Sequence, residues 1–514
     1  MMFLPLIFSY AEIHYHLKKI YPLYFKKFPE IIADVPSRFI YSKFKYLPIL
    51  VLIKDSHIYP IKLKKIVVRI KNSFISLEKS SEFDQIIDSP FFSTIIKLED
   101  ETEEFNQDGY VNIDVIIHFS KNNKDFSCIN DNYDLPYKPF ICYFSSEPLP
   151  YPKNWYAGDT HYHSSYTEDQ VEFGADIPAT VEMARVMGLD WFFVTDHSYD
   201  LDDTITDYTV NDPKLPKWKK FLKEIEELKS DEIKVIPGVE VSIGNQRNRN
   251  VHLLAVNHDK FIKGSGDSAE KWFSNKPEEH IRNIAKLQNN RNLFIAAHPW
   301  EKVPFLQKIT LRRDNWHEQD FAEGGINYLQ IINSNDKSAL DESKKKWSDL
   351  LLKGRKIFIV AGNDAHGNFN IMRQIKLPFV KLFSNRKQIF GKYHTVFNYT
   401  DNDPIKGLKK GRIIVSNGPF LDLNLSASGK TFAIGSTVTR GNYTLEFTAS
   451  SGKEFGRINA ISLFYGNYKL DSERLIKDPQ NYSEIELKIP GYIRMELLTE
   501  FDGVVLTNPI WIEN

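Results

Sequence analysis

The chain has 514 residues, of which 42% are hydrophobic and 26% are charged, a composition typical of a globular protein with two or three domains. Its formal net charge of −1 argues against binding to nucleic acid through a basic surface. With only two cysteines, Cys128 and Cys142, the composition excludes a disulfide framework and a thiolate metal site. Any metal ion would therefore need histidine and carboxylate ligands.

Residues 1–10 form a short apolar run at the start of the chain. No basic residue precedes this run and no small-residue cleavage pattern follows it, so it is a poor signal peptide. No other stretch approaches the length of a membrane span. We therefore expect a cytoplasmic protein that does not cross a membrane.

The stretch up to residue 150 carries the patterns of β-strands. Residues 46–54 form a continuous apolar run, and apolar residues alternate over 61–70 and 111–117. Turn residues at 122–123 follow the last of these runs. We expect an N-terminal β domain of immunoglobulin-like form over residues 1–150.

From residue 154 strands alternate with helices. Strand-like runs cover residues 190–195, 233–236, 252–256, 293–297, 326–332 and 356–361. Helical patterns cover residues 177–188, 218–229, 277–290 and 337–353. Such alternation predicts a mainly parallel sheet or barrel, in which functional residues gather beyond the C-terminal ends of the strands.

Histidines and acids follow these strands in turn. Because side chains alternate along an extended backbone, His161 and His163 point to the same side, where both can bind one ion. His252 departs from the rule, since it begins its strand-like run. Any one of these histidines could simply be a hydrogen-bonded side chain with no functional role. The occurrence of the same residue types at five separate strand ends argues against that explanation for the whole set. The residues at strand ends are His161 and His163, Asp196 and His197, Glu240, His298, and Asp364 and His366.

After about residue 400 the helical pattern stops and short strand-like runs return. They cover residues 413–416, 443–448, 461–465, 485–489 and 492–498. We expect a C-terminal β domain over residues 401–514. Neither flanking β domain contains a catalytic constellation, so we expect both to buttress the middle domain, to dimerise or to help select substrate.

Five motifs in order, HYH, TDHS, PGVEVS, AHP and DAH, resemble those of the PHP superfamily, named for polymerase and histidinol phosphatase. The resemblance covers about residues 154–370. It implies an α/β fold in which a distorted (β/α)7 barrel, here residues 151–400, is flanked by the two β domains. The flanking sequences GRIIVSNGPFLDL and VVLTNPIWI resemble the carbaryl-hydrolase-like branch of metallohydrolases.

The resemblance implies a set of metal ligands. His161, His163, Glu240 and Asp364 would bind a first ion, and Glu168 and His197 would bind a second. Glu168 stands where many relatives have Asp, and the adjacent Asp169 is an alternative. Glu240 would also bridge ions, and His252, His298 and His366 would complete a third position. Asp159 and Asp196 would orient neighbouring imidazoles.

Three carboxylates and six histidines in one pocket require two or three divalent cations to balance their charges. Nitrogen and oxygen ligands suit Zn, Mn or Fe, and the sequence does not choose among them. An ion-activated water would be the nucleophile, so no serine or cysteine nucleophile is needed. We expect Glu240 and Asp364 to take part in catalysis through these ions.

The wider superfamily implies hydrolysis of a phosphoester in a small phosphorylated or nucleotide-like substrate. Residues 371–400 contain six lysines and arginines and no acid, so this segment could clamp a phosphate, with Arg373 nearest in sequence to the ligands; the alternative is a solvated basic loop. The flanks imply instead a carbamate or carboxylic ester hydrolase. A catalytically silent binding or scaffold protein is a third interpretation. The expected partner is a small anionic molecule. The sequence does not determine the oligomeric state, and a homo-oligomer is one possibility.

Overall fold

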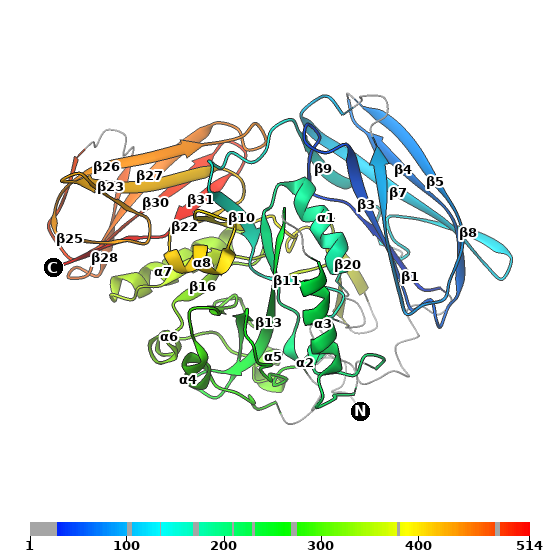
Figure 1. The fold of residues 1–514 in the computed structure, drawn as a ribbon, viewed down its shortest axis with the longest axis horizontal. Helices are drawn as coiled ribbons and strands as arrows, with labels where there is room; N and C mark the ends of the chain where they lie inside the picture. Colours follow the sequence, from blue (N-terminus) through cyan, green and yellow to red (C-terminus); the bar gives the residue numbers. More distant parts are fainter. Residues whose placement is uncertain are drawn as a thin grey trace.

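The structure is a computed structural model. It describes residues 28–514 except 74, 100–104, 134, 168–173, 208–209, 229–231, 269–274, 378–380 and 478–483. Figure 1 shows a central region that carries the helices, in green to yellow, between N-terminal strands in blue and C-terminal strands in orange and red. None of the described helices is long and apolar enough to cross a membrane.

Two sheets form the N-terminal region. One has the strand order β1-β3-β6 and the other the order β2-β9-β7-β4-β5, with β8 beside β7. Their inward-facing residues, such as Ile49, Ile66 and Ile113, share one hydrophobic core. The strands are β1 (Glu30–Asp34), β2 (Arg38–Ile40), β3 (Tyr46–Lys54), β4 (Ile61–Lys71), β5 (Ser76–Ile87), β6 (Phe91–Glu99), β7 (Gly109–Lys121), β8 (Lys124–Ile129) and β9 (Phe140–Ser145).

The central sheet runs in the order β17-β16-β15-β14-β13-β12-β10. Its short strands are buried along almost their whole length, as continuous apolar runs predict. The strands are β10 (Trp155–Asp159), β12 (Trp191–Val194), β13 (Lys234–Gly244), β14 (Asn250–Val256), β15 (Leu293–Ala296), β16 (Tyr328–Ile332) and β17 (Phe358–Ala361).

The pairing in this sheet is mixed, which differs from the mainly parallel sheet predicted. β13 and β14 form an antiparallel hairpin, and β14 is also antiparallel to β15, whereas β10-β12-β13 and β15-β16-β17 are parallel. Beyond β10 the sheet continues through β21 (His394–Asn398) into C-terminal strands. In the described chain no ladder joins β17 to β10, so a closed (β/α)7 barrel is not shown.

Helices connect the parallel strands. α1 (Ile177–Met187) begins where the Asp176 carboxylate accepts a hydrogen bond from the Ala179 amide, and it ends at Gly188 with φ 87°. The helix predicted over 277–290 is mostly absent, since only α4 (Ile281–Ile284) and a 3₁₀ turn (Ala285–Leu287) form there. The other helices are α2 (Ser198–Leu201), α3 (Pro216–Glu227), α5 (Phe305–Thr310), α6 (Glu318–Gly324), α7 (Lys337–Leu352) and α8 (Pro404–Lys410).

The C-terminal strands extend the central sheet in the order β21-β22-β31-β30-β27-β28, with β25 and β32 alongside, and form a second sheet, β24-β23-β26-β29. Two small pairs, β11 with β18 and β19 with β20, complete the fold. The remaining bounds are β11 (Tyr162–His163), β18 (Ala365–His366), β19 (Met372–Leu377), β20 (Lys381–Asn385), β22 (Ile413–Ser416), β23 (Phe420–Ala427), β24 (Lys430–Ala433), β25 (Thr437–Thr439), β26 (Gly441–Ser450), β27 (Ile458–Asn467), β28 (Ser472–Lys477), β29 (Glu484–Leu487), β30 (Gly491–Thr499), β31 (Val504–Thr507) and β32 (Ile510–Glu513).

Candidate metal centre

Short backbone pairings bring the first and last histidine motifs together. β11 and β18 lie in parallel register, with His163 opposite His366, and their rings stack with centroids 4.2 Å apart. Asp364 and His298 both adopt positive φ, 51° and 24°, which is uncommon for residues other than glycine. Such backbone strain persists where the surrounding structure imposes it, and it clusters at functional sites.

Four buried side chains present ligand atoms to one point. Nε2 of His161 and Nε2 of His163 are 3.1 Å apart, and both lie 3.1–3.3 Å from Oε2 of Glu240 and Oδ1 of Asp364. Tetrahedral ligands about 2.0–2.1 Å from an ion lie about 3.3 Å from one another. The separations in this set therefore match those of the ligands of one ion.

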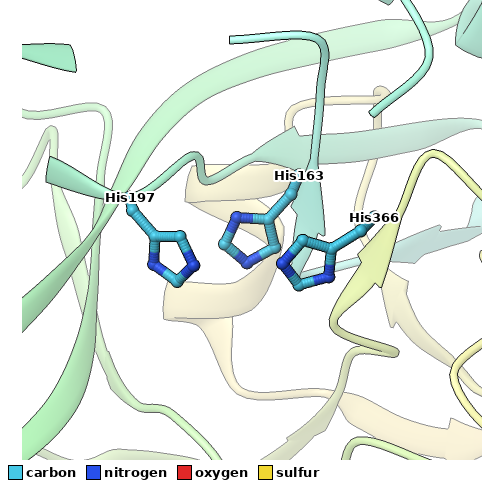
Figure 2. Close-up of side chains that lie close together, drawn as sticks. All are labelled: His163, His197 and His366. Atoms are coloured by element: carbon cyan, nitrogen blue, oxygen red, sulfur yellow. The ribbon is translucent and has the colours of Figure 1, made fainter. Parts of the chain in front are cut away.

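Two further groups adjoin the first. His163, His197 and His366 face one another, as Figure 2 shows. Nε2 of His197 is buried and has no hydrogen-bond partner in the described part of the chain. Glu240, His252 and His298 form the third group. Within each group the ligand atoms lie within 4.8 Å of one another. The groups share His163 and Glu240, so they form one continuous centre.

Glu240 is the hub of this centre. Its Oε2 lies 3.2 Å from His197 Nδ1 in addition to the contacts given above, and this buried oxygen accepts no hydrogen bond from the described residues. Its Oε1 lies 2.7 Å from His252 Nδ1 and 3.0 Å from His298 Nε2. The two carboxylate oxygens thus face different groups, which is the arrangement of a bridging ligand.

The hairpin explains why His252 does not follow the strand-end rule. In the antiparallel β13–β14 pair, His252 lies opposite Ser242, two residues beyond Glu240. The beginning of β14 therefore lies beside the end of β13. An antiparallel insertion brings the first half of a strand to the edge where its parallel neighbours end.

Polar residues that the sequence analysis missed orient these imidazoles. The side-chain oxygen of Gln330 accepts from Nδ1–H of His161 (2.9 Å) and from the amide of His298 (3.2 Å), while its amide group donates to Gly362 O. This directs Nε2 of His161 at the other ligands, where it could bind an ion once its proton is released. Metal-binding histidines usually donate their second N–H in this way. The only sequence signal was that Gln330 is a polar residue inside a buried strand.

Acids support two other histidines. Oδ2 of Asp267 lies 2.8 Å from Nε2 of His252, so that Nδ1 of this ring faces Glu240. Asp196, expected to orient an imidazole, accepts from the Thr167 hydroxyl (2.8 Å), and that hydroxyl lies 3.3 Å from His163 Nδ1. Asp159 instead accepts hydrogen bonds from backbone and amide groups, including the amide of His161.

Burial and mutual attraction set the protonation of the centre. Burial alone would raise the pKa of Glu240, but the charges of His252 and His161 hold it well below its ordinary value. Burial likewise opposes protonation of His163, but Asp364 and Glu240 raise its pKa well above normal. Burial and the charge of His163 lower the pKa of His366 well below normal. The neutral ring of His366 thus lies beside the ring of His163, which holds a proton until a cation replaces it.

The structure brings together every predicted ligand that it describes, with one regrouping. His366 lies with His163 and His197 rather than with His252 and His298. Glu168 and its alternative Asp169 lie outside the described residues.

Arg373 corrects the expectation of a phosphate clamp. It is buried against the N-terminal sheets, where Nε donates to Asp131 Oδ2 at 2.7 Å and Nη2 donates to Ala33 O at 3.3 Å. Its Nη1 donates to Ile371 O, immediately before β19. These contacts use the guanidinium to join β19 to the N-terminal region.

A cleft opens at the edge of the centre. It has a volume of about 550 Å³ and reaches the centre at His298, Gln330 and Gln388. Gln388 donates to Oδ2 of Asp364 at 3.0 Å. Apart from Trp300 and two isoleucines the lining is mainly hydroxyl, amide and charged side chains, with two lysines against three carboxylates. One lysine, Lys387, is 3.2 Å from Asp336.

No family model and no curated protein matches the chain. Among solved structures it is similar to a two-domain protein from Bacteroides vulgatus that contains a predicted PHP-like metal-dependent phosphoesterase. The two share 12% identity over 71% of this chain and 98% of that one, with a TM-score of 0.33. A Parabacteroides merdae β-glucuronidase shares 9% identity over 94% of this chain and 64% of its own length, with a TM-score of 0.21. At these TM-scores neither likeness assigns a fold or an activity, and neither protein is described as a carbaryl hydrolase.

Proposed function

We propose that the protein is a metal-dependent hydrolase of the PHP type, and that it cleaves a phosphoester in a small polar molecule. One observation carries the proposal: four buried ligand atoms, two of histidine and two of carboxylate, lie at the mutual separations of a set that surrounds a single ion. The adjoining groups extend this set to two or three ions through shared residues.

Each group of the chain would hold an ion with its own donors. His161, His163, Glu240 and Asp364 would hold the first; His163, His197 and His366 would hold the second; and Glu240, His252 and His298 would hold the third. When bound, divalent ions supply an acidified water and neutralise the charge of a phosphoryl group. The chain offers nitrogen and oxygen donors only, which suits Zn, Mn or Fe(II).

The protein residues would then hold the ligand atoms in position and exclude bulk water from the centre. Gln330 holds the His161 ring so that Nε2 faces inward, and Asp267 does the same for Nδ1 of His252. The ligating side chains of the first group are at most 1% exposed, which limits the approach of bulk water. Ligands that are rigid before substrate binds lower the reorganisation needed during the reaction.

The cleft supports the choice of a small polar substrate. With two lysines against three carboxylates, it offers no surplus of cations to hold a phosphate. The charge of the phosphoryl group would therefore be held by the ions of the centre, and the remainder of the substrate would meet hydroxyl and amide groups. An aryl carbamate would place an apolar ring in this cleft, where Trp300 is the one aromatic side chain of the lining.

Turnover of three compounds tests the proposal and its two alternatives. Purified protein loaded with Mn or Zn should hydrolyse p-nitrophenyl phosphate or bis-p-nitrophenyl phosphate more readily than an aryl N-methylcarbamate. Carbamate turnover without phosphoester turnover would replace the phosphoesterase with a carbamate hydrolase. Fewer than one divalent ion per chain, in protein purified without chelator and then offered metal, would favour the silent binding protein.

A further inference from the structure

A second cavity lies where three parts of the chain meet. It has a volume of about 180 Å³ and is lined by residues of the N-terminal sheets, of the central region and of the C-terminal strands. Leu149, Met187 and Leu189 supply apolar lining. Three cations, Arg38, Arg386 and Lys392, and one carboxylate, Glu454, also line it.

Arg38 and the carboxylate satisfy each other. Nε of Arg38 lies 2.9 Å from Oε2 of Glu454, and the side chains of both are about nine-tenths buried. Nη2 of Arg38 also donates to Ser145 Oγ at 2.8 Å and to Glu147 O at 2.6 Å. This pair joins β2 to the connection between β26 and β27 across the cavity.

The other two cations are not balanced in the same way. Arg386 donates from Nη2 to Pro139 O at 2.6 Å, but its buried Nε has no hydrogen-bond partner among the residues that the structure describes. The ammonium of Lys392 forms neither a hydrogen bond nor an ion pair with any part of the chain that the structure describes. Both side chains are partly buried. Asp34 attracts the charge of Arg386 and Glu454 attracts that of Lys392, but within the described residues neither carboxylate forms an ion pair with these cations. An anion bound between the two cations would therefore supply hydrogen-bond acceptors that they lack.

We propose that this junction cavity binds a phosphate-sized oxyanion between Arg386 and Lys392. A tetrahedral oxyanion has acceptors for the unused donors of both side chains, and its charge offsets theirs. The volume accommodates inorganic phosphate with a few waters and leaves little room for a larger ester. Such binding would not depend on the reaction proposed above.

The chain segment that carries both cations also contacts the metal centre. Gln388, between them in sequence, donates to Asp364 at 3.0 Å, and the amide of Gly391 donates to Asp159 at 2.9 Å. An anion that holds Arg386 and Lys392 would therefore steady the residues that contact a candidate ligand. The site would serve as an effector site for the centre.

Calorimetric titration of the full chain with phosphate tests the site. The protein is first treated with EDTA, so that binding of phosphate to metal ions does not contribute. We expect one phosphate per chain, with affinity reduced about tenfold or more in Arg386→Gln and in Lys392→Gln, since each removes a charge from a partly buried site. Lys387→Gln is the matched control, because Lys387 lies in the same segment but lines the other cleft. Glycerol 3-phosphate, as a second probe, should bind more weakly than phosphate.

The melting temperature gives an independent readout. Phosphate should raise it in the wild type and in Lys387→Gln but not in the other two variants. Equal phosphate affinity in all four proteins would overturn the proposal, as would the absence of binding at millimolar phosphate. A loss of affinity in Lys387→Gln as large as in Lys392→Gln would also overturn it.

Discussion

Replacing Glu240 with glutamine tests the bridging arrangement most directly. The substitution keeps the size of the side chain but removes its charge, and it places a donor where only acceptors lie now. Glu240 is 1% exposed, and its two oxygens contact nitrogens of five histidines between 2.7 and 3.3 Å. No water can compensate for the lost charge.

The magnitude follows from the cost of removing one partner from a buried charged set. That cost is about 3–5 kcal/mol. At about 1.4 kcal/mol for each factor of ten, metal affinity should fall by about two to three and a half orders of magnitude. Because both oxygens serve separate groups, the loss should affect more than one ion. Turnover should fall with metal content, since the ions supply the nucleophile.

Metal content after gel filtration and turnover of bis-p-nitrophenyl phosphate would be measured on the same preparations. Glu182→Gln is the control, because Glu182 pairs with Arg185 on α1 and lies outside the three groups. Its metal content and turnover should match the wild type. Normal metal content together with normal turnover in Glu240→Gln would refute the bridging role.

Three other outcomes are expected. Gln330→Leu should weaken metal binding about 10- to 100-fold, measured by chelator competition, because the His161 ring loses its orienting acceptor; unchanged affinity would contradict this. Arg373→Ala should lower the free energy of unfolding by about 3–5 kcal/mol, because it breaks the ion pair with Asp131. The metal content per folded chain should not change. A loss of metal without a loss of stability would instead indicate that Arg373 belongs to the metal centre. In metal-free protein, burial lowers the pKa of His252, but the charge of Glu240 outweighs this and raises it from 6.5 to about 10. The stability that this proton contributes is therefore complete below about pH 6.5 and is lost as pH rises toward 10. Metal binding requires release of the proton, so metal affinity should rise over the same pH range. A metal affinity that does not change with pH would count against His252 as a ligand.

The pattern of histidines and acids near predicted strand ends was sufficient to predict, from the sequence, that these side chains lie together. His161, His197 and His298 each follow a buried strand, and parallel strands end at one edge. Glu240 lies inside β13, just beyond the point where its parallel pairing with β12 ends at Pro237. The structure places these side chains in overlapping groups. The prediction depended on the apolar runs, which locate the end of each strand to within a few residues.

Pairing direction could not be read in the same way. A buried apolar run such as 252–256 looks the same in a parallel and an antiparallel strand. The short connection over residues 245–249 was the available signal for a hairpin, because a parallel crossover needs about a dozen residues or more. Recognising it would have explained why His252, expected as a ligand from the family resemblance, lies at the beginning of its strand and not at the end.

Contacts between distant parts of the chain were harder still. Arg373 follows the DAH motif by only a few residues, but its guanidinium is directed to Asp131 in the N-terminal region. Gln330 and Asp267 carry no motif, because a single amide or carboxylate is common and its partner is defined only by the fold. Sequence spacing thus identified the groups that could ligate but not those that orient them.

The sharing of residues between groups has a consequence for how the centre works as a unit. Each oxygen of Glu240 serves a different group, and His163 belongs to two. Neutralising the carboxylate from one side weakens its attraction for the histidine protons on the other, so occupancy of one position changes the proton balance of the next. The same sharing lets few carboxylates serve many buried histidines. Glu240 and Asp364 both contact the two histidines of the first group, Glu240 also contacts those of the third, and Asp267 adds a separate counter-charge for His252. The fold therefore builds one coupled centre from strand ends, in place of several independent sites.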